Sequence, residues 1–193
     1  MDAINELVSL GLGRSAEVLN LMLNSHIELS APVVQLLNPE ELKEALANGP
    51  ELLSAVAMHY GGSMSGVAEL IFGTGQAGRL VDCITGEDHG LEEGLDALRA
   101  GALCEVGNIV INAMMGAISN ELQFSLDYNV PTYLEGGIGS LMAEARLSES
   151  QAVLLAKTVF NVQSLQIEGE IAIFMSMASL HFLEDALERY VSR

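Results

Sequence analysis

The chain has 193 residues, of which half are hydrophobic and only 18% are charged, and this composition excludes a disordered chain. Its 8 basic and 26 acidic residues give a net charge of −18, so nucleic acid and anionic membrane surfaces are disfavoured as partners. Residues 1–6 lack the basic start and apolar run of a signal peptide, and the longest nearly apolar segment, 171–183, is too short and too interrupted to span a bilayer. We therefore expect a compact cytoplasmic protein without a transmembrane helix.

The first half of the chain predicts a helix, an extended segment, a hairpin and a second helix. The first helix shows helical spacing of apolar residues, and we expect its buried stripe to hold Leu7, Leu10, Val18, Leu21 and Met22. In chain order we expect a helix over 3–24, an extended segment over 26–37 around Pro32, a loop or a short helix over 40–46, strands over 52–60 and 63–72 joined by Gly61-Gly62, and a helix over 73–84.

The second half predicts the same order of elements. Alternation in its last apolar run puts Glu168 and Glu170 on the face opposite the isoleucines, which indicates a strand. In chain order we expect a helix over 91–122, an extended segment over 124–134 around Pro131, strands over 151–163 and 167–177, and a helix over 179–191.

The repeated order predicts one α+β domain built from two pseudo-repeats. The repeats are 1–85 and 97–193, joined by an acidic connector over 86–96. Each repeat is too small to be stable alone. The two repeats, with three strands each, would therefore combine into a largely antiparallel six-stranded sheet packed with the long helices. Gly11, Gly13 and Gly107 are expected to permit close packing of the backbone.

Neither a disulfide nor a metal site is predicted. Cys83 and Cys104 lie in apolar helical patterns and are interpreted as reduced core thiols. The four histidines are scattered, and the local cluster Glu87-Asp88-His89 lies in the acidic connector, where solvation explains it better than metal binding. We expect neither a metal nor another cofactor on this chain.

A nucleotide-binding motif is also rejected. The segment 73–78 fits the G-x-G-x-x-G string, but a dinucleotide site needs a parallel βαβ unit, which the predicted order lacks.

A spaced motif marks the duplication. Glu6, Ser9 and Pro32 recur as Glu105, Asn108 and Pro131, each shifted by 99 residues, in a chain with only four prolines. The prolines are expected to be structural, because proline fixes φ and removes a ladder donor.

The second copy of the motif carries the chemistry that we consider most informative. On a helix, Glu105 and Asn108 project to the same side, and Asn112 and Ser119 continue that polar stripe. A carboxylate and an amide are a thin set for acyl transfer or metal hydrolysis. They suit hydrolysis of a phosphoryl group on a partner, where an amide positions water and the acid binds a cation.

These residues resemble a known family. Leu103-Cys104-Glu105-Val106-Gly107-Asn108-Ile109 with Pro131, together with 10–16 and Pro32, resembles the CheC family of chemotaxis phosphatases over nearly the whole chain. The resemblance implies removal of the phosphoryl group from phosphorylated CheY-like response regulators. It also implies that the asparagine orients the attacking water, that the glutamate docks on a regulator lysine, and that Mg²⁺ is held by the regulator.

The two copies depart from the family pattern, Asp/Ser-x3-Glu-x2-Asn-x22-Pro, in different ways. The second copy has Gly101 at its leading position, and the first keeps Asp2 but has Ser9 in place of the asparagine. A serine hydroxyl cannot present the donor and acceptor of a carboxamide at the same reach. We expect an active site at Glu105 and Asn108, with catalysis weakened or absent at Glu6 and Ser9.

Two functions stay open at this point. The first is an aspartyl-phosphate phosphatase acting on a receiver domain, and the second is a CheC-like adaptor that sequesters a receiver or another signalling protein with little or no turnover. The resemblance leaves open whether a CheD-like protein binds and whether the chain is a monomer or a homodimer.

Overall fold

The computed structural model describes residues 2–23, 26–86, 95–144, 151–162 and 165–192, and it shows one order of elements twice. Each half contains a long helix, two short strands, a short helix, a long hairpin and a closing helix. The first half is α1 (Asp2–Leu23), β1 (Ile27–Leu29), β2 (Val33–Leu37), α2 (Pro39–Ala47), β3 (Leu53–Gly62), β4 (Gly66–Gly73) and α3 (Thr74–Thr85). The second is α4 (Ala97–Glu121), β5 (Leu126–Tyr128), β6 (Thr132–Gly136), α5 (Ile138–Glu144), β7 (Gln151–Val162), β8 (Leu165–Ser176) and α6 (Met177–Val191).

The strands form one antiparallel sheet in the order β1-β7-β8-β4-β3-β5, with β2 also on β7 and β6 also on β3. The α+β class and the antiparallel sheet are confirmed, but the sheet has eight strands within the described residues, where six are predicted. Each extended segment is split in two close to its proline, Pro32 or Pro131, because proline has no N–H to donate to the ladder. The two short pieces then occupy one row beside a single long strand.

The two halves exchange these short strands. β1 and β2 of the first half pair with β7 of the second, and β5 and β6 of the second pair with β3 of the first. Between these outer rows lie the two hairpins, joined to each other through β4 and β8. Neither half therefore completes its row of strands without the other.

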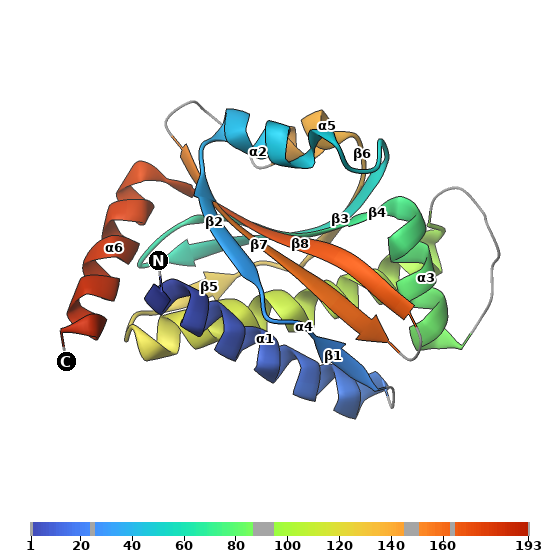
Figure 1. The fold of residues 1–193 in the computed structure, drawn as a ribbon, viewed down its shortest axis with the longest axis horizontal. Coiled ribbons are helices and arrows are strands. Elements are labelled where there is room, and N and C mark those ends of the chain that lie inside the picture. Colours follow the sequence, from blue (N-terminus) through green and yellow to red (C-terminus); the bar gives the residue numbers. More distant parts are fainter. Residues whose placement is uncertain (1, 24–25, 87–94, 145–150, 163–164, 193) are drawn as a thin grey trace.

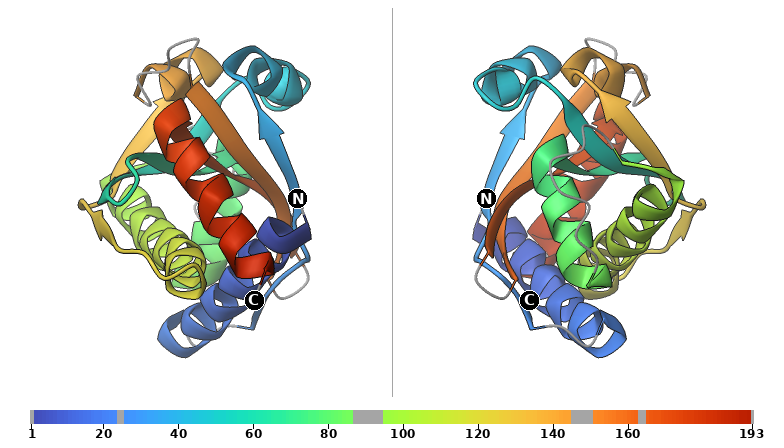
Figure 2. Two further views of the ribbon diagram at one scale, coloured as in Figure 1. Left: turned by 90° about the vertical axis from the view of Figure 1, so that its left-hand side faces the viewer. Right: turned by 90° about the vertical axis from the view of Figure 1, so that its right-hand side faces the viewer.

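The helices cover both faces of the sheet (Figure 1). α1 and α4 lie side by side below it, with α3 and α6 at its ends, and they enclose the larger of two buried apolar clusters. α2 and α5 lie together over the opposite face and close a smaller cluster around Leu42 and Leu141 (Figure 2). Because both faces are covered, residues 171–175 of β8 are all buried, and the predicted alternation holds only in its first half.

α1 and α4 approach closely at small residues. A Cβ atom on Gly11 would lie 2.5 Å from the Met114 Cα, and the Ser15 hydroxyl donates to the Val110 carbonyl at 3.3 Å. These two contacts exchange under the same 99-residue shift that relates the two motifs. On the other side of α4, a Cβ on Gly107 would lie 2.5 Å from Val56 of β3.

The expectation about glycines is thus confirmed at Gly11 and Gly107 and is wrong at Gly13, where an added Cβ would meet nothing within 4 Å. The predicted stripe on α1 is also largely wrong. Of its five residues only Leu7 is buried, because the close approach at Gly11 turns a different set of side chains inward. The buried apolar residues of α1 are Ile4, Leu7, Val8, Leu12 and Leu19.

The hairpin turn lies after Gly62 and not at Gly61-Gly62, because β3 runs on to pair with β5; Gly62 has φ of +107° at this point. The string at 73–78 follows a strand that pairs only antiparallel, so no βαβ unit is present there. Residues 87–94 of the acidic connector, including Glu87-Asp88-His89, lie outside the described residues.

α4 is a core helix of apolar composition. Its length and hydropathy would allow it to cross a membrane, but half of that stretch is buried inside the fold. Its apolar side chains on the face toward the core are fully buried, among them Leu103, Val106, Val110, Met114 and Ala117. Packing against α1 and the sheet accounts for the apolar sequence.

Candidate functional site on helix α4

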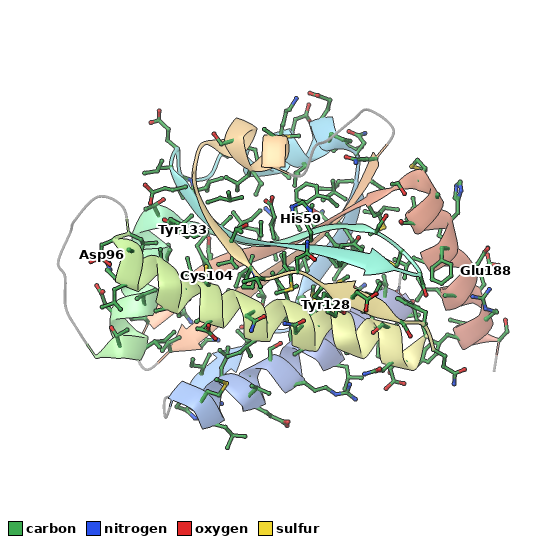
Figure 3. All side chains as sticks on the ribbon, turned by 180° about the vertical axis from the view of Figure 1, so that it is seen from behind. His59, Asp96, Cys104, Tyr128, Tyr133 and Glu188 are labelled. Carbon is green, nitrogen blue, oxygen red and sulfur yellow. The ribbon has the colours of Figure 1, made fainter. Side chains whose placement is uncertain are left out.

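Glu105, Asn108 and Pro131 line one open depression of about 490 Å³. Figure 3 looks onto this side of the molecule, with α4 across the front and Cys104 and Tyr128 labelled at the depression. The helix supplies Glu105 and Asn108, and the segment between β5 and β6 supplies Pro131. The depression is lined by Gly101, Cys104, Glu105, Asn108, Asn112, Tyr128, Asn129, Val130 and Pro131.

The start of α4 is firmly anchored, which fixes the position of Glu105 further along the helix. Asp96 caps the helix by accepting a hydrogen bond from the Arg99 backbone N–H at 2.9 Å. The Arg99 side chain is 5% exposed and pairs with Asp82 of α3, with 3.4 Å between Nε and Oδ1. Burial of the opposite face of α4 then leaves the Glu105 carboxylate exposed to solvent.

The carboxamide of Asn108 is held by its neighbour one turn on. Asn112 Nδ2 donates to Asn108 Oδ1 at 2.7 Å and to the Asn108 backbone carbonyl at 2.8 Å. Both side chains are half-buried at the wall of the depression. Glu105 and Asn108 thus present a carboxylate and an oriented amide on one face of one helix.

The opposite wall is a short stretch before β6. The Asn129 backbone N–H donates to the His59 carbonyl of β3 at 3.0 Å, which ties this stretch to the sheet. Val130 is 84% exposed beside half-buried Pro131. Burial raises the pKa of the Tyr128 phenol, and the Ser119 hydroxyl opposes that rise, so the ring contributes a neutral hydroxyl near neutral pH.

Cys104 also faces the depression. Burial, and then the neighbouring Glu105 carboxylate, raise the pKa of the Cys104 thiol above its ordinary value, so it is protonated and weakly nucleophilic at neutral pH. Cys83 and Cys104 are free thiols, as predicted, but both are half-buried and neither is a fully buried core residue. Within the residues that the structure describes, no group of three or more His, Cys, Asp or Glu side chains is arranged to hold a metal ion.

The first copy of the motif is arranged differently. Glu6 and Ser9 are exposed on α1, and Pro32 is half-buried before β2. The Ser9 hydroxyl donates to the Asn5 carbonyl at 2.7 Å, so it is engaged with its own helix. The position equivalent to Asn112 is Gly13, so this copy lacks both amides.

The sequence predicts the three motif residues of the second copy, and the structure brings them together. The spacing of the motif does not predict that Tyr128, Asn129 and Val130 also line the depression. Their position directly before Pro131 in the chain is the one signal that could have indicated it. The helical pattern puts Asn112 on the polar stripe but gives it no role, because such a pattern predicts the face of a side chain and not its hydrogen bonds.

Comparisons with known proteins agree with this architecture. No family model matches the chain. CheY-P phosphatase CheC of Bacillus subtilis is 26% identical over 181 residues, which cover 91% of this chain and 86% of the relative. Flagellar motor switch phosphatase FliY of Bacillus subtilis is 23% identical over 163 residues, or 84% of this chain but only 42% of that longer protein.

Solved structures share the fold. Thermotoga maritima FliY has a TM-score of 0.78 at 15% identity, covering 98% of this chain and 96% of its own. The FliM middle domain of H. pylori has a TM-score of 0.70 at 9% identity, with 96% of each chain covered. A chain of the CheX-CheY-BeF3-Mg complex of Borrelia burgdorferi has a TM-score of 0.54 at 16% identity, covering 86% of this chain and 96% of that one. This chain is therefore homologous to CheC and FliY over most of its length, and it shares the fold of FliY.

Proposed function

We propose that the chain hydrolyses the aspartyl phosphate of a CheY-like receiver domain at the depression on α4. The observation that carries the proposal is the joint placement of Glu105, Asn108 and Pro131 at one depression, with the Asn108 amide held by Asn112. The name of the relative CheC, a CheY-P phosphatase, supports the same reaction.

In this proposal the chain positions the attacking water and the receiver, and the receiver neutralises the charge on the phosphoryl group. The Asn108 amide holds a water molecule, accepting a hydrogen bond through Oδ1 and donating through Nδ2, in line with the phosphorus of the receiver's aspartyl phosphate. The exposed Glu105 carboxylate pairs with a lysine on the receiver and sets the register of the complex. Water attacks phosphorus, the bond to the aspartate oxygen breaks, and inorganic phosphate and the free carboxylate are released.

The Mg²⁺ ion belongs to the receiver, where it neutralises charge on the phosphoryl group, and the complex forms in the cytoplasm. A CheD-like protein and a second copy of this chain are further candidate partners, which co-purification and the mass of the complex in solution would identify.

The test is dephosphorylation of candidate receivers from the source organism. Each receiver is phosphorylated by a small phosphodonor, which is then removed, and phosphate release is followed with and without the chain. Asn108→Ala should lower turnover about 100-fold, because the attacking water is no longer aligned. Asn120→Ala, an exposed amide on the same helix, is the matched control and should leave turnover unchanged. Parent-like turnover by Asn108→Ala would contradict the role of that residue.

A second function is favoured by two departures from the motif, Ser9 and Gly101. The same fold occurs in FliM, which was crystallised in a complex with FliG, and a fold does not fix an activity. In this alternative the chain is an adaptor that sequesters a receiver without turnover. A tight complex with a phosphorylated receiver, combined with an unchanged rate of phosphate loss, would establish the adaptor and overturn the phosphatase.

A further inference from the structure

We infer that Asn112 is a positioning residue, which sets the orientation of the Asn108 amide at the depression. The inference rests on the proposed function, because that function requires the Asn108 amide to present its oxygen and its nitrogen to a water molecule in one fixed orientation. It is carried by the two hydrogen bonds from Asn112 Nδ2, at 2.7 Å to the Asn108 side-chain oxygen and 2.8 Å to the Asn108 backbone carbonyl.

An asparagine amide needs such a restraint to act as a directional water holder. Its last torsion has a broad, roughly twofold preference, so a free amide exchanges its oxygen and nitrogen by a half-turn at small cost. For Asn108, that half-turn would place its NH₂ group against the NH₂ group of Asn112, and two donors would face each other. Asn112 therefore favours the orientation with Oδ1 toward itself and Nδ2 on the other branch.

The restraint leaves the amide usable. An amide oxygen has two acceptor positions, and Asn112 occupies one of them, so Oδ1 retains a position for a water O–H. The Asn112 donor is itself fixed, because it also binds the Asn108 backbone carbonyl of the same helical turn. The orientation is thus built into α4 before a receiver binds.

The other copy of the motif supports this reading. The positions equivalent to Asn108 and Asn112 are Ser9 and Gly13, so the two amides are present together in one copy and missing together in the other. Packing does not require the glycine, since an added Cβ at Gly13 would meet nothing within 4 Å. Both amides are therefore present or absent together, as expected if the amide of Asn112 orients the amide of Asn108.

Two substitutions separate the hydrogen bond from packing. Asn112→Ala removes the amide, and Asn112→Asp keeps its shape but replaces the donor by an acceptor. Both should lower kcat for receiver dephosphorylation about fivefold to tenfold, the effect of losing the hydrogen bond to the Asn108 side chain, with the KM for phosphorylated receiver unchanged and the thermal midpoint lowered by only a few degrees. Asn120→Asp adds the same charge to an exposed position of the helix and should behave as the parent.

A spectroscopic readout keeps the test independent of activity. The side-chain amide proton resonances of Asn108, assigned by comparison with Asn108→Ala, should shift in Asn112→Ala. If the parent has no turnover on any receiver, the proposed function fails while this measurement still decides the contact. The inference is overturned if those resonances do not move, if Asn112→Asp keeps parent turnover, or if the substitutions raise KM at unchanged kcat.

Discussion

Two glycines of α1 differ sharply in what surrounds them, although they are two positions apart. Gly11 faces the Met114 backbone at the crossing with α4, where an added Cβ would lie 2.5 Å from the Met114 Cα. Gly13 is exposed, with open space around it. A glycine inside a helix costs about 0.5–1 kcal/mol relative to alanine, so only the first has a packing reason to be there.

Alanine at each position should therefore change the free energy of unfolding in opposite directions. Gly11→Ala should lower it by about 1–3 kcal/mol, because the two helices must separate. Gly13→Ala should raise it by about 0.5–1 kcal/mol, because the unfolded chain loses freedom at no steric cost. Urea unfolding followed by circular dichroism measures both, and each variant is the control for the other. Equal midpoints for the two variants would show that the helix crossing is not tight at Gly11.

The residues of the candidate site divide into those that spacing predicts and those that it does not. Glu105, Asn108 and Pro131 could be predicted because the motif repeats with a fixed shift and the helical period gives the shared face. The bond from Asn112 to Asn108 could not, because it depends on the rotamers of two side chains. The hydrogen bond from the Ser9 hydroxyl to the Asn5 carbonyl could not be predicted either, because it also depends on a side-chain rotamer.

Periodicity predicts the long helices, the hairpins and an antiparallel sheet, but it misses the short helix α5 and does not give the number or the pairing of the strands. The order of elements follows from runs of apolar residues and from proline, which are local signals. Strand pairing between the halves is not local, and nothing in the sequence of β1 indicates that it lies on β7. The same gap explains the wrong stripe on α1, because the rotation of a helix depends on which helix packs against it.

On strand β8, covering of the second face of the sheet partly buries the Glu170 carboxyl and changes its pKa. Glu170 lies opposite Lys157 of β7, with 4.0 Å between the charged atoms, and its side chain is 22% exposed. Burial raises the pKa of the Glu170 carboxyl, Lys157 opposes the rise, and Glu168 adds to it. The folded protein thus holds a proton at Glu170 more readily than the unfolded chain does.

This raised pKa predicts a pH-dependent gain for Glu170→Gln. As the pH rises through the window between the unfolded and the folded pKa of Glu170, the parent loses stability because its folded state binds more protons. The variant has no such loss, so its thermal midpoint should exceed that of the parent by about 2 °C at pH 7, and by less at pH 4. The exposed Glu168→Gln is the comparison and should show a smaller gain, because Glu168 only adds to the rise that burial causes at Glu170. A variant less stable than the parent at pH 7 would mean that the pairing with Lys157 outweighs the burial.

The duplication makes the two halves of the chain depend on each other for their packing and strand pairing. α1 of the first half packs against α4 of the second, and the short strands of each half complete the sheet row of the other. The two motif faces are consequently carried by two helices that pack directly against each other at Gly11. The loss of the amides from one copy leaves the fold intact, because the residues of the crossing and of the strand pairing are separate from them.

This interdependence predicts how fragments of the chain behave. Fragments 1–86 and 95–193 should each lack a cooperative thermal transition as monomers, because β7 would lose β1 and β2, and β3 would lose β5 and β6. Refolded together, they should form a one-to-one complex with a cooperative transition, measured by circular dichroism and by light scattering for the mass. The full-length chain is the reference. A fragment that folds as a homodimer would still fit, since a second copy would supply the missing rows. A fragment that unfolds cooperatively as a monomer would contradict the exchange of strands as the basis of the fold.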